Sequence, residues 1–262
     1  MPFIELPNHK IHYALTGAPA TSSAPVLVLS NSLGTTFSMW DPQLPVFEKY
    51  FRLLRYDTRG HGQSGVPSGP YTIEQLGGDV IALLDALKIK SGHFCGLSMG
   101  GLTGLWLGLH AANRFSKLVI SSASAKFGTA EGWNARIETV RKDGMPSIAA
   151  QVIKRWYTPE FCESAPGLVS ATLQMLERVS PAGYIANCEA LRDTDLRYSI
   201  ASIHTPTLII SGAKDPVSPP ADAKFLAEKI PVAQYLELNA AHLSNVEASD
   251  DYTAAVLRFL SE

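Results

Sequence analysis

Short apolar runs and amphipathic helical stretches alternate along most of the chain. The runs at residues 25–30, 51–56 and 92–97 are largely apolar, which is typical of strands buried on both faces of a parallel sheet. The full pattern predicts strands over 25–30, 51–56, 92–97, 117–121, 207–211 and 233–238, and helices over 72–87, 99–112, 219–229 and 249–260. Strands that alternate with crossover helices indicate an α/β fold built on a parallel sheet.

The first fifteen residues follow a different pattern. Apolar and polar positions alternate over 3–6 and 11–15, and the turn-forming cluster Pro7-Asn8-His9-Lys10 separates them. We therefore expect an antiparallel hairpin before the parallel strands. Together these elements predict an eight-stranded, mostly parallel sheet flanked by helices.

Residues 126–197 interrupt the strand pattern after the sixth predicted strand. Amphipathic helical stretches occupy this region, with breaks at Gly144-Met145-Pro146, Thr158-Pro159 and Ser180-Pro181. An insertion at this point lies over the carboxyl edge of the sheet, where ligands bind in open α/β folds. We predict a core formed by 1–125 and 198–262, and a cap of three to five helices formed by 126–197.

The pentapeptide Gly96-Leu97-Ser98-Met99-Gly100 follows an apolar run and precedes a helical stretch. This is the context of a nucleophile elbow, in which a sharp turn holds a serine Oγ clear of the sheet. Glycines two residues before and after the serine let the neighbouring backbone approach without a Cβ clash. The alternative is a strand-to-helix turn with no catalytic role. Residues further along the chain favour the nucleophile over this alternative.

A serine nucleophile needs a base within hydrogen-bond reach and a carboxylate that orients the base. Downstream of residues 126–197, Asp215 and His242 each follow a predicted strand, in the chain order serine, acid, histidine. The competing histidines lie within a strand, within a helix, and at the opposite sheet edge: His93, His110 and His204. We therefore predict that Ser98, Asp215 and His242 form a catalytic triad.

Acyl transfer also requires hydrogen-bond donors for the oxyanion of the tetrahedral intermediate. The backbone N–H of Met99, directly after the serine, is one expected donor. The other is expected from the loop Asn31-Ser32-Leu33-Gly34 after an early strand, with the Leu33 N–H as the predicted donor.

The segment 57–64, Asp-Thr-Arg-Gly-His-Gly-Gln-Ser, directly follows a buried strand. One interpretation is a catalytic Asp–His pair. The stronger one is structural: Asp57 and Arg59 brace the loop by a charge-assisted hydrogen bond, while the glycines shape its turns.

Composition narrows the classes of partner. The formal charge is −2 and the sequence has no polybasic run. We therefore expect the protein to bind neither nucleic acid nor an anionic membrane surface. Three widely spaced cysteines match neither a disulfide framework nor a zinc site, so we expect no metal and no cofactor. The opening residues carry an acid where a signal peptide has lysines, and we expect a cytoplasmic protein.

With these residues in place, the chain resembles the α/β-hydrolase superfamily over essentially its whole length. The loop Asn31–Gly34, the 57–64 segment, the serine elbow, Asp215 and His242 occur in the family's order. A serine rather than an aspartate at the elbow argues against haloalkane dehalogenases and epoxide hydrolases. Within the superfamily the chain is most similar to 3-oxoadipate enol-lactonases of the β-ketoadipate pathway of aromatic catabolism. That similarity rests on Asn31–Gly34 in place of a His-Gly pair, Tyr56–Gly62, and Ala241–Glu247 around the base.

This resemblance implies hydrolysis of a small acidic lactone through an acyl-enzyme, with no cofactor. The free carboxylate of such a substrate needs a cation or several donors. Trp133 and Arg136 share a helix face in the cap, and we predict that they supply an apolar wall and that cation. A surface ion pair of Arg136 with Glu138 or another acid is the competing interpretation. A short-chain carboxylesterase, a C–C bond hydrolase and a non-catalytic receptor stay open as alternatives, as does a homo-oligomer.

Overall fold

A computed structural model of the protein describes residues 2–18 and 23–262. Eight strands form one sheet in the order β1-β2-β4-β3-β5-β6-β7-β8. Their bounds are β1 (Phe3–Glu5), β2 (Lys10–Gly17), β3 (Val26–Ser30), β4 (Arg52–Tyr56), β5 (Gly92–Leu97), β6 (Phe115–Ser121), β7 (Thr207–Gly212) and β8 (Ala233–Leu238). The β1–β2 and β2–β4 pairs are antiparallel, and every later neighbour pair is parallel. The predicted hairpin and mostly parallel sheet are confirmed.

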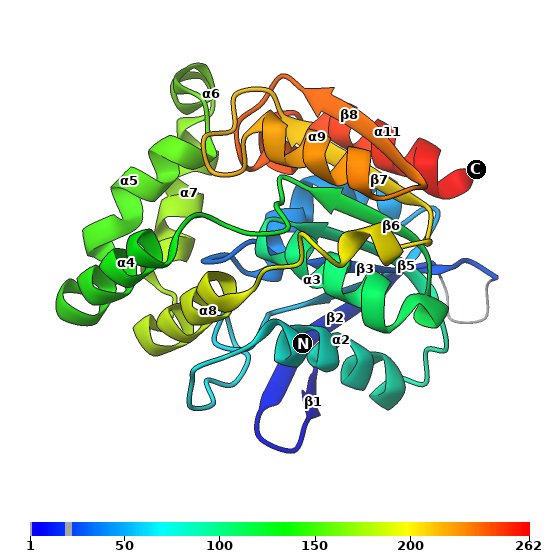
Figure 1. Ribbon diagram of the computed structural model, residues 1–262, viewed down its shortest axis with the longest axis horizontal. Helices are drawn as coiled ribbons and strands as arrows, with labels where there is room; N and C mark the ends of the chain where they lie inside the picture. The colour runs from blue at the N-terminus through cyan, green and yellow to red at the C-terminus, as the bar shows by residue number, and fades with distance from the viewer. Residues whose placement is uncertain (1, 19–22) are drawn as a thin grey trace.

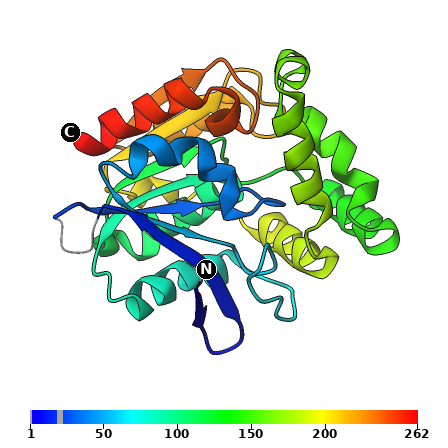
Figure 2. The same ribbon diagram turned by 180° about the vertical axis from the view of Figure 1, so that it is seen from behind.

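Helices cover both faces of this sheet. On one face α2 (Ile73–Ala86) packs against α3 (Met99–His110), and α9 (Pro220–Lys229) packs on β7 and β8 (Figure 1). On the other face α1 (Leu44–Phe47) contacts α11 (Ser249–Ser261), as Figure 2 shows from behind. The central strands β3 and β5 are buried along their whole length, which explains their continuous apolar sequence.

Short elements next to the sheet were not predicted. They are the 3₁₀ helices η1 (Phe37–Gln43), η2 (Ala112–Arg114) and η3 (Ile200–Ser202), and the helices α1 and α10 (Ser244–Glu247). Each is too short to display a helical period in its sequence. The longer elements agree with their predicted spans to within one or two residues, because their ends are marked by local signals such as the Thr72 capping box at the start of α2.

Between β6 and β7 the chain forms five consecutive helices: α4 (Ala130–Asp143), α5 (Pro146–Trp156), α6 (Pro159–Ser164), α7 (Pro166–Glu177) and α8 (Pro181–Asp193). In both views these helices lie together at one end of the sheet (Figures 1 and 2). Thr129, Thr158 and Ser180 cap α4, α6 and α8 by accepting a backbone N–H. The region corresponds to the predicted cap, and its division from the core as a separate unit stays a prediction.

The cap and the core approach closely at a pair of glycines. A Cβ on Gly183, in the first turn of α8, would lie 2.1 Å from the Gly60 carbonyl oxygen. Gly60 has a φ of 80°, so it also needs the left-handed backbone region that glycine favours. The backbone of α8 therefore packs directly on the turn that follows β4.

Candidate active site

Ser98 sits at the sharp turn between β5 and α3, with a φ of 58° and a ψ of −115°. This is a strained conformation for a residue with a side chain, and the glycines on either side make the turn fit. A Cβ on Gly96 would lie 2.2 Å from the Gly100 carbonyl oxygen, and one on Gly100 would lie 2.3 Å from the Ser30 carbonyl oxygen. The Gly100 N–H donates to the Asn31 carbonyl oxygen at 3.0 Å, which fixes the elbow against the end of β3.

The structure brings Ser98, His242 and Asp215 together, as the sequence predicts. The His242 Nε2 lies 2.9 Å from the Ser98 Oγ, and the His242 Nδ1 lies 2.8 Å from the Asp215 Oδ2. The histidine and the aspartate follow β8 and β7, whose carboxyl ends reach the same sheet edge as β5. All three side chains are buried. A carboxylate on Nδ1 leaves Nε2 free to accept the serine proton.

Several donors hold the Asp215 carboxylate. Its Oδ1 accepts the N–H groups of Val217 and Ser218 at 2.7 and 3.1 Å, and its Oδ2 accepts the Ser218 hydroxyl at 2.8 Å. Burial alone would raise the pKa of Asp215, but the charge and hydrogen bond of His242 and these donors outweigh it and lower that pKa. Ser218 was not predicted, because a serine three residues after the acid carries no signal in the sequence alone.

The loop that carries His242 is tied to the cap. The Glu247 carboxylate accepts the Ala241 N–H at 2.9 Å and also accepts the Thr158 hydroxyl of the cap. The Leu243 N–H donates to the Trp156 carbonyl oxygen at 3.0 Å. These contacts flank the histidine, so the position of the base depends on cap residues as well as on the sheet.

The two predicted oxyanion donors belong to the start of α3 and to the loop after β3. Met99 begins α3, where a backbone N–H has no partner within the helix. In the loop after β3, the Ser32 N–H donates to the Met39 Sδ and the Gly34 N–H donates to the His61 Nε2. Among the described residues the Leu33 N–H between them has no acceptor. A donor without a protein acceptor is what the predicted oxyanion role requires.

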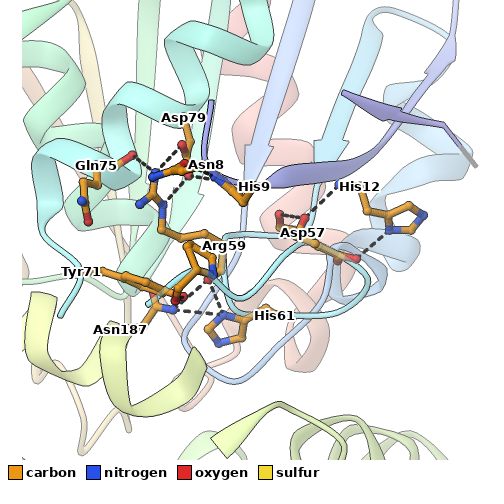
Figure 3. A network of polar contacts seen from close by, with 12 residues as sticks. Asn8, His9, His12, Asp57, Arg59, His61, Tyr71, Gln75, Asp79 and Asn187 are labelled. Atoms are coloured by element: carbon orange, nitrogen blue, oxygen red, sulfur yellow. Dashed lines mark hydrogen bonds and ion pairs between the residues drawn. The ribbon is translucent and has the colours of Figure 1, made fainter. Parts of the chain in front are cut away.

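The predicted brace between Asp57 and Arg59 is wrong. Arg59 forms a bidentate pair with Asp79 on α2, from Nε to Oδ2 at 2.7 Å and from Nη2 to Oδ1 at 2.6 Å. Asp57 instead faces the Nδ1 of His12 at 2.7 Å (Figure 3). Asp57 therefore ties the loop to β2 through His12, and Arg59 ties it to α2 through Asp79.

Two cap arginines face a small cavity next to the Asp215 loop. Its volume is about 190 Å³, and it is lined by Phe127, Gly128, Thr129, Gly132, Trp133, Arg136, Arg155 and Val217. The Arg136 guanidinium lies 5.4 Å from the Trp133 ring centre. Burial lowers the pKa of Arg155, and the nearby charge of Arg136 lowers it further. Two cations are therefore held close together at this cavity.

Neither arginine forms an ion pair with a carboxylate within residues 2–18 and 23–262, although the charge of Asp215 partly offsets the lowering of the Arg155 pKa. The competing interpretation of Arg136 is wrong, because Glu138 pairs with Arg141 instead. Arg155 contacts the Pro216 carbonyl oxygen at 3.3 Å. The sequence singles out Arg136 among the cap cations by its spacing from Trp133, and the cavity adds Arg155 as its neighbour.

Comparisons with known proteins show which proteins this chain is similar to. A family model for the alpha/beta hydrolase fold matches residues 25–150. Two proteins from Acinetobacter baylyi named 3-oxoadipate enol-lactonase are 45% and 43% identical, over 94% and 88% of this chain and 91% and 86% of their own length. The crystal structure of the enol-lactonase from Burkholderia xenovorans LB400 matches with a TM-score of 0.98 and 44% identity over 100% of both chains.

The chain belongs to the α/β-hydrolase family. The predicted fold and the prediction that the chain is a hydrolytic enzyme are confirmed. In this hydrolase two of the rejected histidines pack on aromatic rings: His93 lies edge-on to Phe51, and His110 lies 4.7 Å from the Trp106 ring. Throughout the part of the chain that the structure describes, no cluster of side chains suited to a metal ion occurs. The helices in that part are all too short or too polar to cross a membrane.

Proposed function

We propose that this hydrolase converts 3-oxoadipate enol-lactone to 3-oxoadipate through an acyl-enzyme on Ser98. The observation that carries the proposal is the hydrogen-bonded line from Ser98 through His242 to Asp215, at 2.9 and 2.8 Å. The names of the relatives from Acinetobacter baylyi and Burkholderia xenovorans support the choice of lactone. A role in the β-ketoadipate pathway and a cytoplasmic location remain predictions.

In the acylation step, the Ser98 Oγ attacks the lactone carbonyl carbon while the hydroxyl proton moves to the His242 Nε2. Negative charge develops on the carbonyl oxygen, which the N–H groups of Leu33 and Met99 stabilise. The ring then opens by cleavage of the acyl–oxygen bond. The leaving group is an enolate, which is stabilised by delocalisation. It takes the proton that the His242 Nε2 received from Ser98 and becomes the ketone, which leaves His242 neutral for the next step.

In the deacylation step, His242 acts again as a general base and activates a water molecule. The resulting hydroxide attacks the acyl carbon, the same N–H groups stabilise the second oxyanion, and Ser98 leaves with a proton from His242. Asp215 stabilises the imidazolium in both steps without itself taking a proton. The product is a dicarboxylate that still carries the 3-oxo group.

The free carboxylate of the lactone is proposed to bind Arg136 and Arg155. Both guanidinium groups face the same cavity, and neither has a carboxylate partner among the described residues. Two neighbouring cations without counter-ions repel each other, and a bound carboxylate relieves that repulsion. The Trp133 ring beside Arg136 supplies an apolar wall for the short chain of the substrate.

A second cavity favours a different substrate class. It has a volume of about 370 Å³, contains no basic residue, and is lined by Ser38, Met39, Asp41, Pro42, Tyr157, Leu168, Ala171, Thr172, Met175, Leu243 and Val246. Leu243 directly follows the proposed base. A neutral short-chain ester would use this apolar cavity rather than the arginine pair, which makes a general carboxylesterase the second candidate.

Comparison of kcat/KM for the enol-lactone and for p-nitrophenyl acetate separates these candidates. We expect a clear preference for the acidic lactone, and a preference for the neutral ester would favour the carboxylesterase. A fluorophosphonate probe tests the chemistry independently of the substrate. We expect an adduct on Ser98 in the wild type and none in Ser98→Ala, whereas an unlabelled wild type would favour the non-catalytic receptor.

The arginine assignment has a matched control on the same helix. Arg136→Ala should lose a charge-assisted contact of about 1.5–3 kcal/mol, which is roughly 10- to 150-fold in kcat/KM for the lactone. Arg141→Ala should change it little, because Arg141 is half exposed and pairs with Glu138. An effect of Arg136→Ala within about twofold would remove Arg136 from the binding site.

A further inference from the structure

The loop that carries the Leu33 donor is held at two successive peptide units. The Ser32 carbonyl oxygen accepts the Thr35 N–H at 3.2 Å and the Thr35 hydroxyl at 2.8 Å. This carbonyl belongs to the same peptide unit as the Leu33 N–H, so its orientation fixes the direction of that donor. The next peptide unit is held from outside the loop, because the Gly34 N–H donates to the His61 Nε2 at 2.8 Å.

The second of these contacts controls the shape of the turn. Residues 32–35 form a tight turn in which Gly34 has a φ of 85°. Turns of this kind exist in two forms that differ by a flip of the central peptide, here the one between Leu33 and Gly34. The His61 ring accepts the N–H of that peptide. This hydrogen bond therefore selects one of the two forms of the turn. It also fixes the peptide that directly follows Leu33.

His61 is itself fixed by the cap. It is 1% exposed, and its Nδ1 faces the Arg59 carbonyl oxygen at 3.4 Å. The Asn187 side chain on α8 donates to the same carbonyl oxygen at 2.9 Å and to the Gly183 carbonyl oxygen at 2.8 Å. Figure 3 shows His61 beside Asn187, with the Arg59 side chain reaching away toward Asp79. A continuous set of contacts thus runs from α8 to the oxyanion loop.

The contact with Gly34 requires a neutral imidazole. The Gly34 group is a donor, so the His61 Nε2 must be unprotonated and the ring proton must lie on Nδ1. Burial lowers the pKa of His61 to about 4, which keeps the ring in this acceptor form near neutral pH.

We propose that His61 is a positioning residue for the hydrolytic reaction: by accepting the Gly34 N–H it sets the oxyanion loop, and Asn187 lets the cap control that setting. The inference rests on the proposed function, since it assumes that the Leu33 N–H stabilises an oxyanion formed on Ser98. It assigns a role in the reaction to the segment 57–64, which otherwise has a bracing role.

The test uses variants that differ in their ability to accept the Gly34 N–H. His61→Phe keeps a planar ring and removes the acceptor. His61→Gln and His61→Asn both keep a polar amide, but the shorter asparagine cannot reach Gly34. This second pair keeps the proposal testable where the phenylalanine variant fails to fold.

We expect His61→Phe and His61→Asn to lower kcat for the enol-lactone at least about tenfold with KM within about twofold, because the interaction is made in the transition state. We expect His61→Gln to retain kcat within about threefold. Asn187→Leu should lower kcat in the same direction, since it removes the contact from α8.

A trifluoromethyl ketone with the acyl chain of the substrate reports on the oxyanion directly. The Ser98 Oγ bonds to the ketone carbon, the hydroxyl proton passes to the His242 Nε2, and the carbonyl oxygen becomes an oxyanion that needs the Leu33 and Met99 donors. The affinity for this probe should fall by the same factor as kcat. The affinity for 3-oxoadipate, which forms no oxyanion, should stay within about twofold.

Asp79→Asn is the matched control, because it loosens the Arg59 side of the same loop without touching Gly34. We expect it to lower thermal stability and to leave the ratio of the two affinities unchanged. Wild-type kcat and ketone affinity in folded His61→Phe or His61→Asn would overturn the inference, as would an equal loss of ketone affinity in Asp79→Asn. A wild type that neither hydrolyses the lactone nor binds the ketone would instead overturn the proposed function.

Discussion

Replacement of Gly183 by alanine tests the contact between α8 and the turn after β4. The added Cβ would lie 2.1 Å from the Gly60 carbonyl oxygen, 2.5 Å from its Cα and 2.7 Å from its carbonyl carbon. All three are backbone atoms, so no side-chain rotation relieves the overlap. Contact distances of about 3.5 Å are needed, and the two segments must separate by more than about 1 Å to reach them.

Moving α8 away from the turn lowers the free energy of unfolding. Overpacking of this kind costs about 1–3 kcal/mol. A movement of about 1 Å also stretches the 2.9 Å hydrogen bond from Asn187 to the Arg59 carbonyl oxygen beyond useful length, at about 0.5–1.5 kcal/mol. The higher helix propensity of alanine offsets up to about 1 kcal/mol of this loss. With that offset in full, the net loss of about 0.5–3.5 kcal/mol corresponds to a fall in Tm of roughly 1–14 °C for a chain of this size.

Gly167→Ala is the matched control for this measurement. Gly167 also lies in the first turn of a cap helix that begins with proline, and a Cβ there meets no atom within 4 Å. We expect it to gain up to about 1 kcal/mol from helix propensity. Urea unfolding and thermal melts of both variants give the comparison. A Gly183→Ala protein as stable as Gly167→Ala would refute the close packing of α8 on this turn.

Two further predictions concern buried titratable groups. The pKa of His61 is about 4 in the folded protein, against an ordinary 6.5 in the unfolded chain. As the pH falls from 6.5 to 4, the unfolded chain takes up a proton that the folded protein does not. The contribution of His61 to the free energy of unfolding is therefore complete above pH 6.5 and is lost as the pH falls toward 4. Between pH 6.5 and 4 the free energy of unfolding of the wild type, measured with urea, should fall by about 3 kcal/mol more than that of His61→Gln. Parallel plots of this free energy against pH for the two proteins would contradict the prediction. Burial raises the pKa of Cys95 and Cys188 to about 12. A thiol reagent should therefore modify Cys162 alone in the folded protein and all three cysteines in denaturant, and rapid native reaction of Cys95 would be inconsistent with its burial.

Much of the fold and the proposed triad could be predicted because their signals are local. The strand at 92–97 is an apolar run, and the elbow after it is a contiguous pentapeptide. Asp215 and His242 were found from their positions after later strands, since the ends of parallel strands meet at one edge. No knowledge of side-chain packing was needed for these assignments.

Pairings between distant side chains could not be predicted in the same way. The sequence pairs Arg59 with its near neighbour Asp57, but its partner Asp79 lies 20 residues away on α2. Likewise, nothing in the sequence separates Arg155 from the other cap cations, because its burial near Arg136 arises from the packing of α4 on α5. Such choices depend on the fold and not on sequence spacing.

Enol-lactone hydrolysis by Ser98→Ala, followed as acid release in a pH-stat, decides whether Ser98 is the nucleophile. We expect kcat to fall at least about 10⁴-fold while circular dichroism and Tm remain those of a folded protein, with a residual rate from the oxyanion donors and substrate binding alone. A folded Ser98→Ala protein that retains kcat within about 100-fold of the wild type would contradict the assignment of Ser98 as the nucleophile.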